Sequence, residues 1–111
     1  MLPSSKRLTT TLVKHVMDEG KVFHSTLFVF KAIKTSGISR FSVIVSKKVA
    51  KTAVERNKIR RRLYSLLNSG YSEISRGVHG IFIVKNDIKK VSVEELATTL
   101  DQFFVKIGLL K

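Results

Sequence analysis

The stretch that decides the fold is FSVIVSKKVAKTAVERNKIRRRLYSLLNS, residues 41–69. Its first six residues place apolar side chains at every second position. This alternation predicts a strand over Phe41–Ser46, with one face formed by Phe41, Val43 and Val45. Thr52-Ala53-Val54-Glu55 then has the Ser/Thr-x-x-Glu pattern of a capping box, so we expect a helix that begins near Ala53.

This helix has a buried stripe and a clear end at Ser69-Gly70. Apolar residues follow the i, i+4, i+7, i+8 spacing of one helix face, at Ile59, Leu63, Leu66 and Leu67. A short apolar run at Gly80–Lys85 predicts a second buried strand. Because a helix joins the two strands, we expect them to be parallel.

The flanking segments supply two more helices and a strand-rich region. A helix is predicted over Thr10–Glu19, followed by Gly20 where a glycine commonly ends a helix. Phe23 and the segment Thr26–Lys34 are rich in residues that favour strands. A last helix begins at the Ser92-Val93-Glu94-Glu95 capping box and ends at Gly108. Its apolar face consists of Val93, Leu96, Ala97, Leu100, Phe103, Phe104 and Ile107.

Together these elements predict an α+β fold. We expect a two-layer α/β sandwich, with helices on one face of a small mixed sheet. Residues 1–111 are expected to form a single domain, because halves of this chain would be too short to bury a core.

The charge of the chain is its most informative global property. Twenty-one Lys and Arg against eight Asp and Glu give +13 at pH 7. Such an excess is typical of proteins whose partner is a polyanion, nucleic acid before an anionic membrane surface. The absence of Cys excludes disulfides and thiolate catalysis. No apolar run is long enough to span a bilayer and no secretory signal is visible, so we expect a soluble, cytoplasmic protein.

The positive charge is concentrated in residues 46–62, where eight of seventeen residues are basic and only Glu55 is acidic. At 100° per residue, the cations of the helix surround every side that the apolar stripe leaves free. Arg56 projects beside the stripe, so we expect it to snorkel or to reach into a groove between helix and sheet. Arginine binds phosphate through two parallel hydrogen bonds, and the Asn57 amide can contact a ribose or a base edge. The segment therefore predicts RNA binding.

Two motifs in this segment resemble the signature of the bacterial ribonuclease P protein family. Ser46-Lys47-Lys48, followed by Arg56-Asn57-Lys58-Ile59-Arg60-Arg61, is similar to that family's Ser-Lys-Lys element and its Arg-Asn-Arg-x-Lys-Arg helix. The likeness continues at Lys6-Arg7-Leu8, at Arg40–Ser46, and from His79-Gly80 through the last helix. It covers nearly the whole chain.

The resemblance implies a fold similar to the second domain of ribosomal protein S5. It also implies a left-handed strand–helix–strand crossover, although parallel strands are ordinarily joined by a right-handed one. The His and acidic residues are scattered in the sequence, so we assign no catalytic or metal-binding residue to this chain. Its partner would be a catalytic RNA whose Mg²⁺ ions activate the water that removes the 5′ leader of precursor tRNA. The RNA-binding residues are then expected to be Ser46, Lys47, Lys48, Lys51, Arg56, Asn57, Lys58, Arg60, Arg61 and Arg62.

In this family a groove between the first helix, the sheet and the basic helix holds the single-stranded leader. Family members commonly carry aromatic residues where this chain has Val13, Met17 and Lys31. Since stacking on an aromatic ring contributes about 1–3 kcal/mol per base, we expect leader binding here to depend more on charge. The candidate groove residues are Val13, Met17, Phe23, Phe28, Lys31 and Tyr64, of which both Phe could equally be core and Tyr64 could stack on a base or cover the helix.

Other classes of protein share some of these properties. A ribosomal protein or a ribosome-assembly factor has the same size and charge and stays open as the alternative. A protein-only nuclease would need clustered Asp or Glu to hold metal ions, and the eight acids form no pair in a predicted cleft. A membrane-surface module would carry large apolar residues at the interface, whereas this basic helix carries mostly Arg opposite its core stripe.

Overall fold

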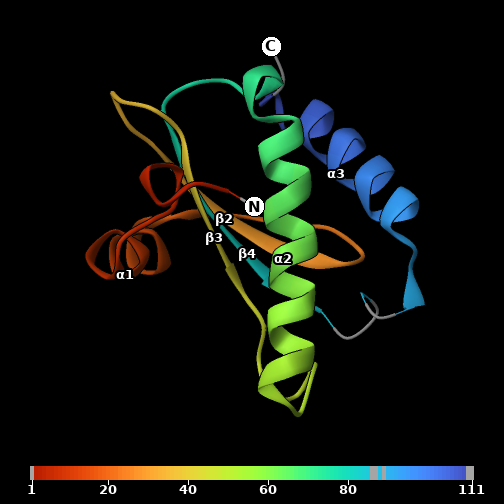
Figure 1. The fold of residues 1–111 in the computed structure, drawn as a ribbon. Helices are drawn as coiled ribbons and strands as arrows, with labels where there is room; N and C mark the ends of the chain where they lie inside the picture. Colours follow the sequence, from red (N-terminus) through yellow and green to blue (C-terminus); the bar gives the residue numbers. More distant parts are fainter. Residues whose placement is uncertain (1, 86–87, 89, 110–111) are drawn as a thin grey trace.

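The computed structural model describes residues 2–85, 88 and 90–109. Within these described residues, three α-helices, two short 3-10 helices and four strands follow one another (Figure 1). They are η1 (Ser4–Lys6), α1 (Thr10–Glu19), β1 (Lys21–His24), β2 (Phe28–Lys34), β3 (Arg40–Ile44), α2 (Ala53–Ser69), η2 (Tyr71–Glu73), β4 (Val78–Val84) and α3 (Val93–Ile107).

The four strands form one mixed sheet in the order β1-β2-β4-β3. β3 and β4 are parallel and the other neighbours are antiparallel, which confirms the predicted strand–helix–strand unit. The strand expected over Thr26–Lys34 begins only at Phe28. The reason is a tight hairpin, closed by a 2.9 Å hydrogen bond from the Ser25 N–H to the Phe28 carbonyl, which separates β1 from β2.

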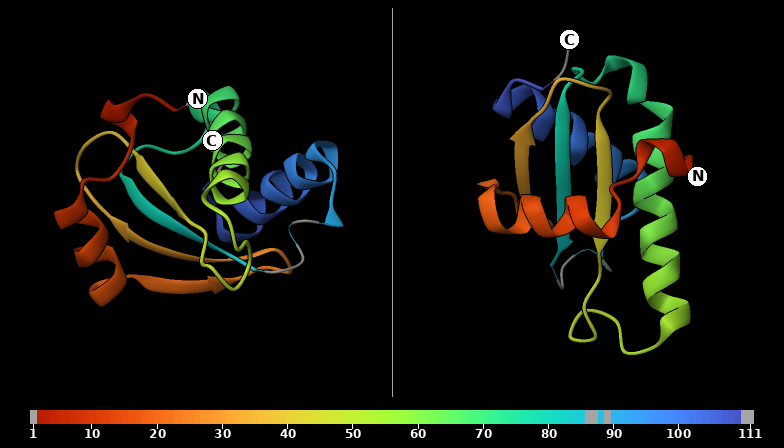
Figure 2. Two further views of the ribbon diagram at one scale, coloured as in Figure 1. Left: turned by 60° about the horizontal axis from the view of Figure 1, so that its bottom comes forward. Right: turned by 90° about the vertical axis from the view of Figure 1, so that its left-hand side faces the viewer.

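The helices lie on both faces of the sheet. α2 and α3 cover one face, and α1 runs across the other (Figures 1 and 2). α1 packs on β2 and β4, where Val16 of α1 and Ile81 of β4 are both fully buried outside the main core. The mixed α+β sandwich is confirmed, but the expectation that the helices share one face is wrong for α1.

The crossover from β3 through α2 to β4 is left-handed. In the right-hand view of Figure 2, α1 faces the viewer and α2 and α3 lie on the far side of the sheet. β3 and β4 both run downward in this view, with β4 to the left of β3. This agrees with the family resemblance and departs from the right-handed rule for parallel strands.

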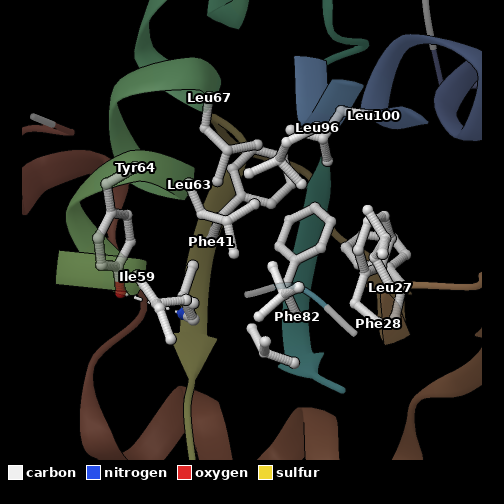
Figure 3. Packing of buried hydrophobic residues seen from close by; sticks show 14 of the residues in the cluster. Leu27, Phe28, Phe41, Ile59, Leu63, Tyr64, Leu67, Phe82, Leu96 and Leu100 are labelled. Atoms are coloured by element: carbon white, nitrogen blue, oxygen red, sulfur yellow. Dashed lines mark hydrogen bonds between the residues drawn. The ribbon is translucent and has the colours of Figure 1, made fainter. Parts of the chain in front are cut away.

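The main core lies between the sheet and the pair α2 and α3. All seven Phe of the sequence belong to one network of ring contacts, which includes Phe28 against Phe103 with ring centroids 5.0 Å apart. Phe41, Val43 and Val45 are buried as the alternation predicts. Figure 3 shows the apolar stripe of α2 facing Phe41 and Phe82 of the sheet.

Local signals set the helix ends. The Thr52 hydroxyl accepts a 3.1 Å hydrogen bond from the Glu55 N–H, and Ser92 does the same for Glu95. Gly108 adopts φ +77°, the left-handed conformation that ends helices at glycine. Gly20 differs, because its backbone is extended. There a Cβ atom would lie 2.4 Å from the Val16 carbonyl oxygen, so close approach and not a left-handed turn requires glycine.

Candidate nucleic-acid interface

A hollow of about 580 Å³ lies between the N-terminal segment and α2. Three arginines line it, together with an amide and a phenol, and none of its lining residues is acidic. We call it the basic hollow; it is lined by Arg7, Asn57, Arg60, Arg61 and Tyr64. Four of the five come from α2, and the fifth comes from a part of the chain far away in sequence.

Backbone pairing brings Arg7 to this place. Arg7 forms a parallel bridge with Phe41 of β3, and the Leu8 N–H donates a 3.0 Å hydrogen bond to the Phe41 carbonyl. The Arg7 Nε–H donates to the carbonyl of Leu2, at 2.8 Å, and Leu2 is itself fully buried. Arg7 was not among the residues predicted for the site, although the family match at Lys6-Arg7-Leu8 pointed to it.

Tyr64 supports the guanidinium of Arg7. The Arg7 Cζ lies 4.9 Å from the centroid of the Tyr64 ring, a cation–π contact. The Tyr64 hydroxyl accepts a 3.1 Å hydrogen bond from the Val43 N–H on the outer edge of β3 (Figure 3). Tyr64 is only 7% exposed. The interpretation that it offers its ring to an RNA base is therefore wrong, and it joins the core stripe of α2.

Two residues of α2 that line the hollow are hydrogen-bonded to each other. A guanidinium N–H of Arg60 donates to the amide oxygen of Asn57, one helical turn earlier. Asn57 is thereby oriented with its amide nitrogen still available as a donor. Arg61 is exposed and Arg60 half-buried, so both cations can be reached by a ligand in the hollow.

Two other cations of α2 face away from the hollow. Lys58 and Arg62 line a smaller hollow of about 210 Å³ beside α3, which Glu55 also lines. The basic helix is thus divided into two flanks. One flank, in the basic hollow, is lined by cations without an acid, and the other includes the single acid of the helix.

Arg56 holds the start of the basic helix in place. Its guanidinium donates to the carbonyls of Ala50 and Lys51, at 3.0 and 3.1 Å. It therefore holds the loop that precedes α2 and does not reach between the helix and the sheet. The long stem is half-buried, as expected for a snorkelling side chain.

The loop before α2 exposes three lysines. Val49 and Ala50 are buried and anchor the loop, and the N–H groups of both donate to the Ser46 carbonyl. Four predicted RNA-binding residues of this loop are exposed: Ser46, Lys47, Lys48 and Lys51. The loop leads directly into the first turn of α2, whose positive dipole end favours phosphate.

The candidate leader-groove residues separate by face of the sheet. Val13, Met17 and Lys31 lie on the α1 side, where the Lys31 ammonium donates to the Met17 carbonyl at 3.2 Å. Phe28 is fully buried against α3, so its assignment to a groove wall is wrong. Phe23 lies directly opposite Phe30, which contacts α3, so Phe23 is also on the wrong face. Side chains of a strand alternate between the two faces of the sheet. The sequence near 23–28 did not show which of these residues would point to which face.

The α1 side also carries a buried histidine that no sequence motif had singled out. His79 of β4 pairs with Arg40 of β3 and is 9% exposed. Burial lowers the pKa of His79 below its ordinary value, and the nearby charges of Arg40 and His15 lower it further. This face therefore has a cation at Arg40 beside an imidazole whose pKa is lowered.

The described residues contain no group of three or more His, Asp or Glu that could hold a metal ion. Within the same part of the chain, no helix is both long and apolar enough to cross a membrane.

Comparison with known proteins identifies the family. The family model Ribonuclease P matches residues 2–108. The ribonuclease P protein component of Clostridium kluyveri is 32% identical over 99 residues, which cover 86% of this chain and 88% of that protein. The protein of the same name from Microcystis aeruginosa is 30% identical over 100 residues, with 86% and 83% covered.

Solved structures share the fold. The ribonuclease P protein of Staphylococcus aureus superposes with a TM-score of 0.83 at 20% identity, covering 96% of this chain and 98% of that one. The protein from Thermotoga maritima gives 0.77 at 22% identity, covering 86% and 92%. With the family model matching nearly its whole length, this chain belongs to the ribonuclease P protein family.

Proposed function

We propose that this chain is the protein subunit that binds the catalytic RNA of ribonuclease P and assists removal of the 5′ leader from precursor tRNA. The observation that carries the proposal is the basic hollow, in which Arg7, Arg60 and Arg61 converge without an acidic residue. Guanidinium groups in this arrangement can neutralise several phosphates at once. A folded RNA presents such closely spaced phosphates.

Contact with the leader is proposed for the α1 side of the sheet. All seven Phe belong to the network that packs against α3, so none is available there. The α1 side instead presents Lys31, Arg40 and aliphatic side chains. We therefore expect the leader to be held through its phosphates and with little preference for particular bases, since stacking on Phe cannot contribute.

The reaction in this proposal is hydrolysis of the phosphodiester at the 5′ end of the mature tRNA. Mg²⁺ ions, held mainly by the RNA, would activate the attacking water and stabilise the leaving oxygen. The residues of this chain would raise the affinity for the substrate and reduce phosphate repulsion where the leader approaches the RNA. No side chain is assigned a proton-transfer step.

The test is cleavage of a precursor tRNA with a 5′ extension by a bacterial ribonuclease P RNA at low Mg²⁺, with and without this protein. We expect the protein alone to be inert and to restore cleavage by the RNA. Tight RNA binding without stimulation would contradict the proposal and favour a ribosomal or assembly role instead. Cleavage by the protein alone would contradict the assignment of catalysis to the RNA.

A further inference from the structure

A second groove, of about 490 Å³, lies between the last turn of α2, η2 and the middle of α3. Its walls are largely apolar, with Leu66 and Ile74 on one side and Ala97 and Leu100 on the other. It lies at the opposite end of α2 from the loop that carries Lys47 and Lys48 (Figure 1). Its lining shares no residue with that of the basic hollow, so the two are separate.

The electrostatics of this groove are opposite to those of the chain as a whole. Glu73 and Asp101 line it and no Lys or Arg does, in a protein of net charge +13. The C-terminal end of α2, a helix of 17 residues, adds the partial negative charge of its last carbonyl groups. Three sources of negative potential thus meet beside an apolar surface.

Both carboxylates are available to a ligand. Glu73 and Asp101 are exposed, and neither forms an ion pair with another residue in the part of the chain that the structure describes. A groove of this volume is large enough for several apolar side chains. RNA and anionic lipid are disfavoured here, because their phosphates would approach two exposed carboxylates.

We propose that this groove docks a cationic amphipathic segment of a protein partner. Apolar side chains from one face of such a helix would enter between Leu66 and Ala97, as in other helix-in-groove complexes. Lys or Arg side chains beside that face would pair with Glu73 and Asp101, which sets the orientation and excludes acidic segments. Because the groove and the basic hollow are at different places on α2, one molecule can hold RNA and this partner together.

The experiment titrates the full-length, isotope-labelled protein with a synthetic peptide of about 18 residues. Its Leu residues are spaced to form one face of a helix, and its Lys residues form the opposite face. We expect amide chemical-shift changes centred on Gly70, Glu73, Ala97 and Asp101. The double variant Glu73→Gln/Asp101→Asn should weaken binding by about three- to tenfold, because it removes two partly exposed ion pairs. Both residues are at the surface, so the variant is expected to fold.

Two controls separate this proposal from general charge attraction. Glu94→Gln/Glu95→Gln removes the same charge from the first turn of α3, outside the groove, and should leave peptide binding unchanged. A peptide with the same composition in scrambled order should bind much more weakly. Absent or scattered shift changes, equal binding of the scrambled peptide, or equal weakening by the control variant would each overturn the proposal. Both double variants should still stimulate precursor cleavage. A negative peptide titration would therefore contradict the docking proposal alone, whereas loss of stimulation by the unaltered protein would contradict the RNA-binding proposal.

Discussion

The guanidinium of Arg7 lies over the ring of Tyr64, with its Cζ 4.9 Å from the ring centroid. This contact joins the N-terminal segment to α2 beside the outer edge of β3. It also places a cation from outside the basic helix next to Arg60 and Arg61. The RNA-binding surface that we propose is therefore a hollow with two walls and not a single helix face.

Arg7→Ala should weaken binding to ribonuclease P RNA and flatten its dependence on salt. Removing one cation that touches a phosphate changes the slope of log K against log salt by about 0.7 to 0.9. Anisotropy titrations between about 50 and 200 mM salt would measure this slope. Lys106→Ala removes the same charge from the exposed end of α3 and should leave the slope unchanged. If the Arg7 variant keeps the full slope, its guanidinium does not contact phosphate.

The two flanks of α2 should contribute unequally to RNA binding. Arg60→Ala/Arg61→Ala removes two cations from the basic hollow, so we expect the salt slope to fall by about 1.4 to 1.8. Lys58→Ala/Arg62→Ala removes two cations from the flank that Glu55 also lines, and should have a smaller effect. Equal reductions in the same titration would show that the RNA does not distinguish the two flanks.

Tyr64→Phe should reduce stability without reducing RNA affinity. The variant leaves the buried Val43 N–H without its acceptor, which costs about 1–3 kcal/mol. The ring that supports Arg7 remains. Urea unfolding would measure the first effect and RNA titration the second. An unchanged free energy of unfolding would mean that the Val43 N–H finds another partner in the variant.

Gly80→Ala should be strongly destabilising. A Cβ atom at Gly80 would lie 2.4 Å from Cζ of the Phe30 ring, inside the Phe network. Forcing an extra methyl group into a packed core costs about 1–3 kcal/mol. Gly37→Ala is the matched control, because nothing lies within 4 Å of its Cβ position, and its effect should stay within about 0.5 kcal/mol. Thermal or urea unfolding of the two variants would measure both losses in stability, and equal losses would contradict the prediction.

Stability should fall as the pH drops below the ordinary histidine pKa of about 6.5. Burial, with the charges of Arg40 and His15, lowers the pKa of His79 in the folded state. The unfolded chain therefore binds more protons between the two pKa values, and protonation favours unfolding there. His79→Gln should remove this part of the pH dependence, whereas replacement of the exposed His24 by Gln should not. Identical pH profiles for His79→Gln and the unaltered protein would refute this assignment.

Much of the local structure follows from the sequence, because it depends on neighbours a few residues apart. The capping boxes at Thr52 and Ser92 predicted where α2 and α3 begin, since a hydroxyl bonds to an N–H three residues later. Strand alternation predicted the buried face of β3. The charge cluster predicted a polyanionic partner, and its motif indicated the family that the comparisons show.

Only the tertiary structure decided which side chains meet. The left-handed crossover and the position of α1 on the far face depend on how whole elements pack, and no local signal encodes that. The burial of Phe28 follows from the register of β2 against β4, and the contact of Arg7 with Tyr64 from an N-terminal segment that pairs with β3. Of the two paths predicted for Arg56, snorkelling or entering a groove, the structure shows the first, because its guanidinium bonds to two carbonyls of the loop before α2. Sequence determined the elements and their chemistry; long-range backbone pairing determined the site.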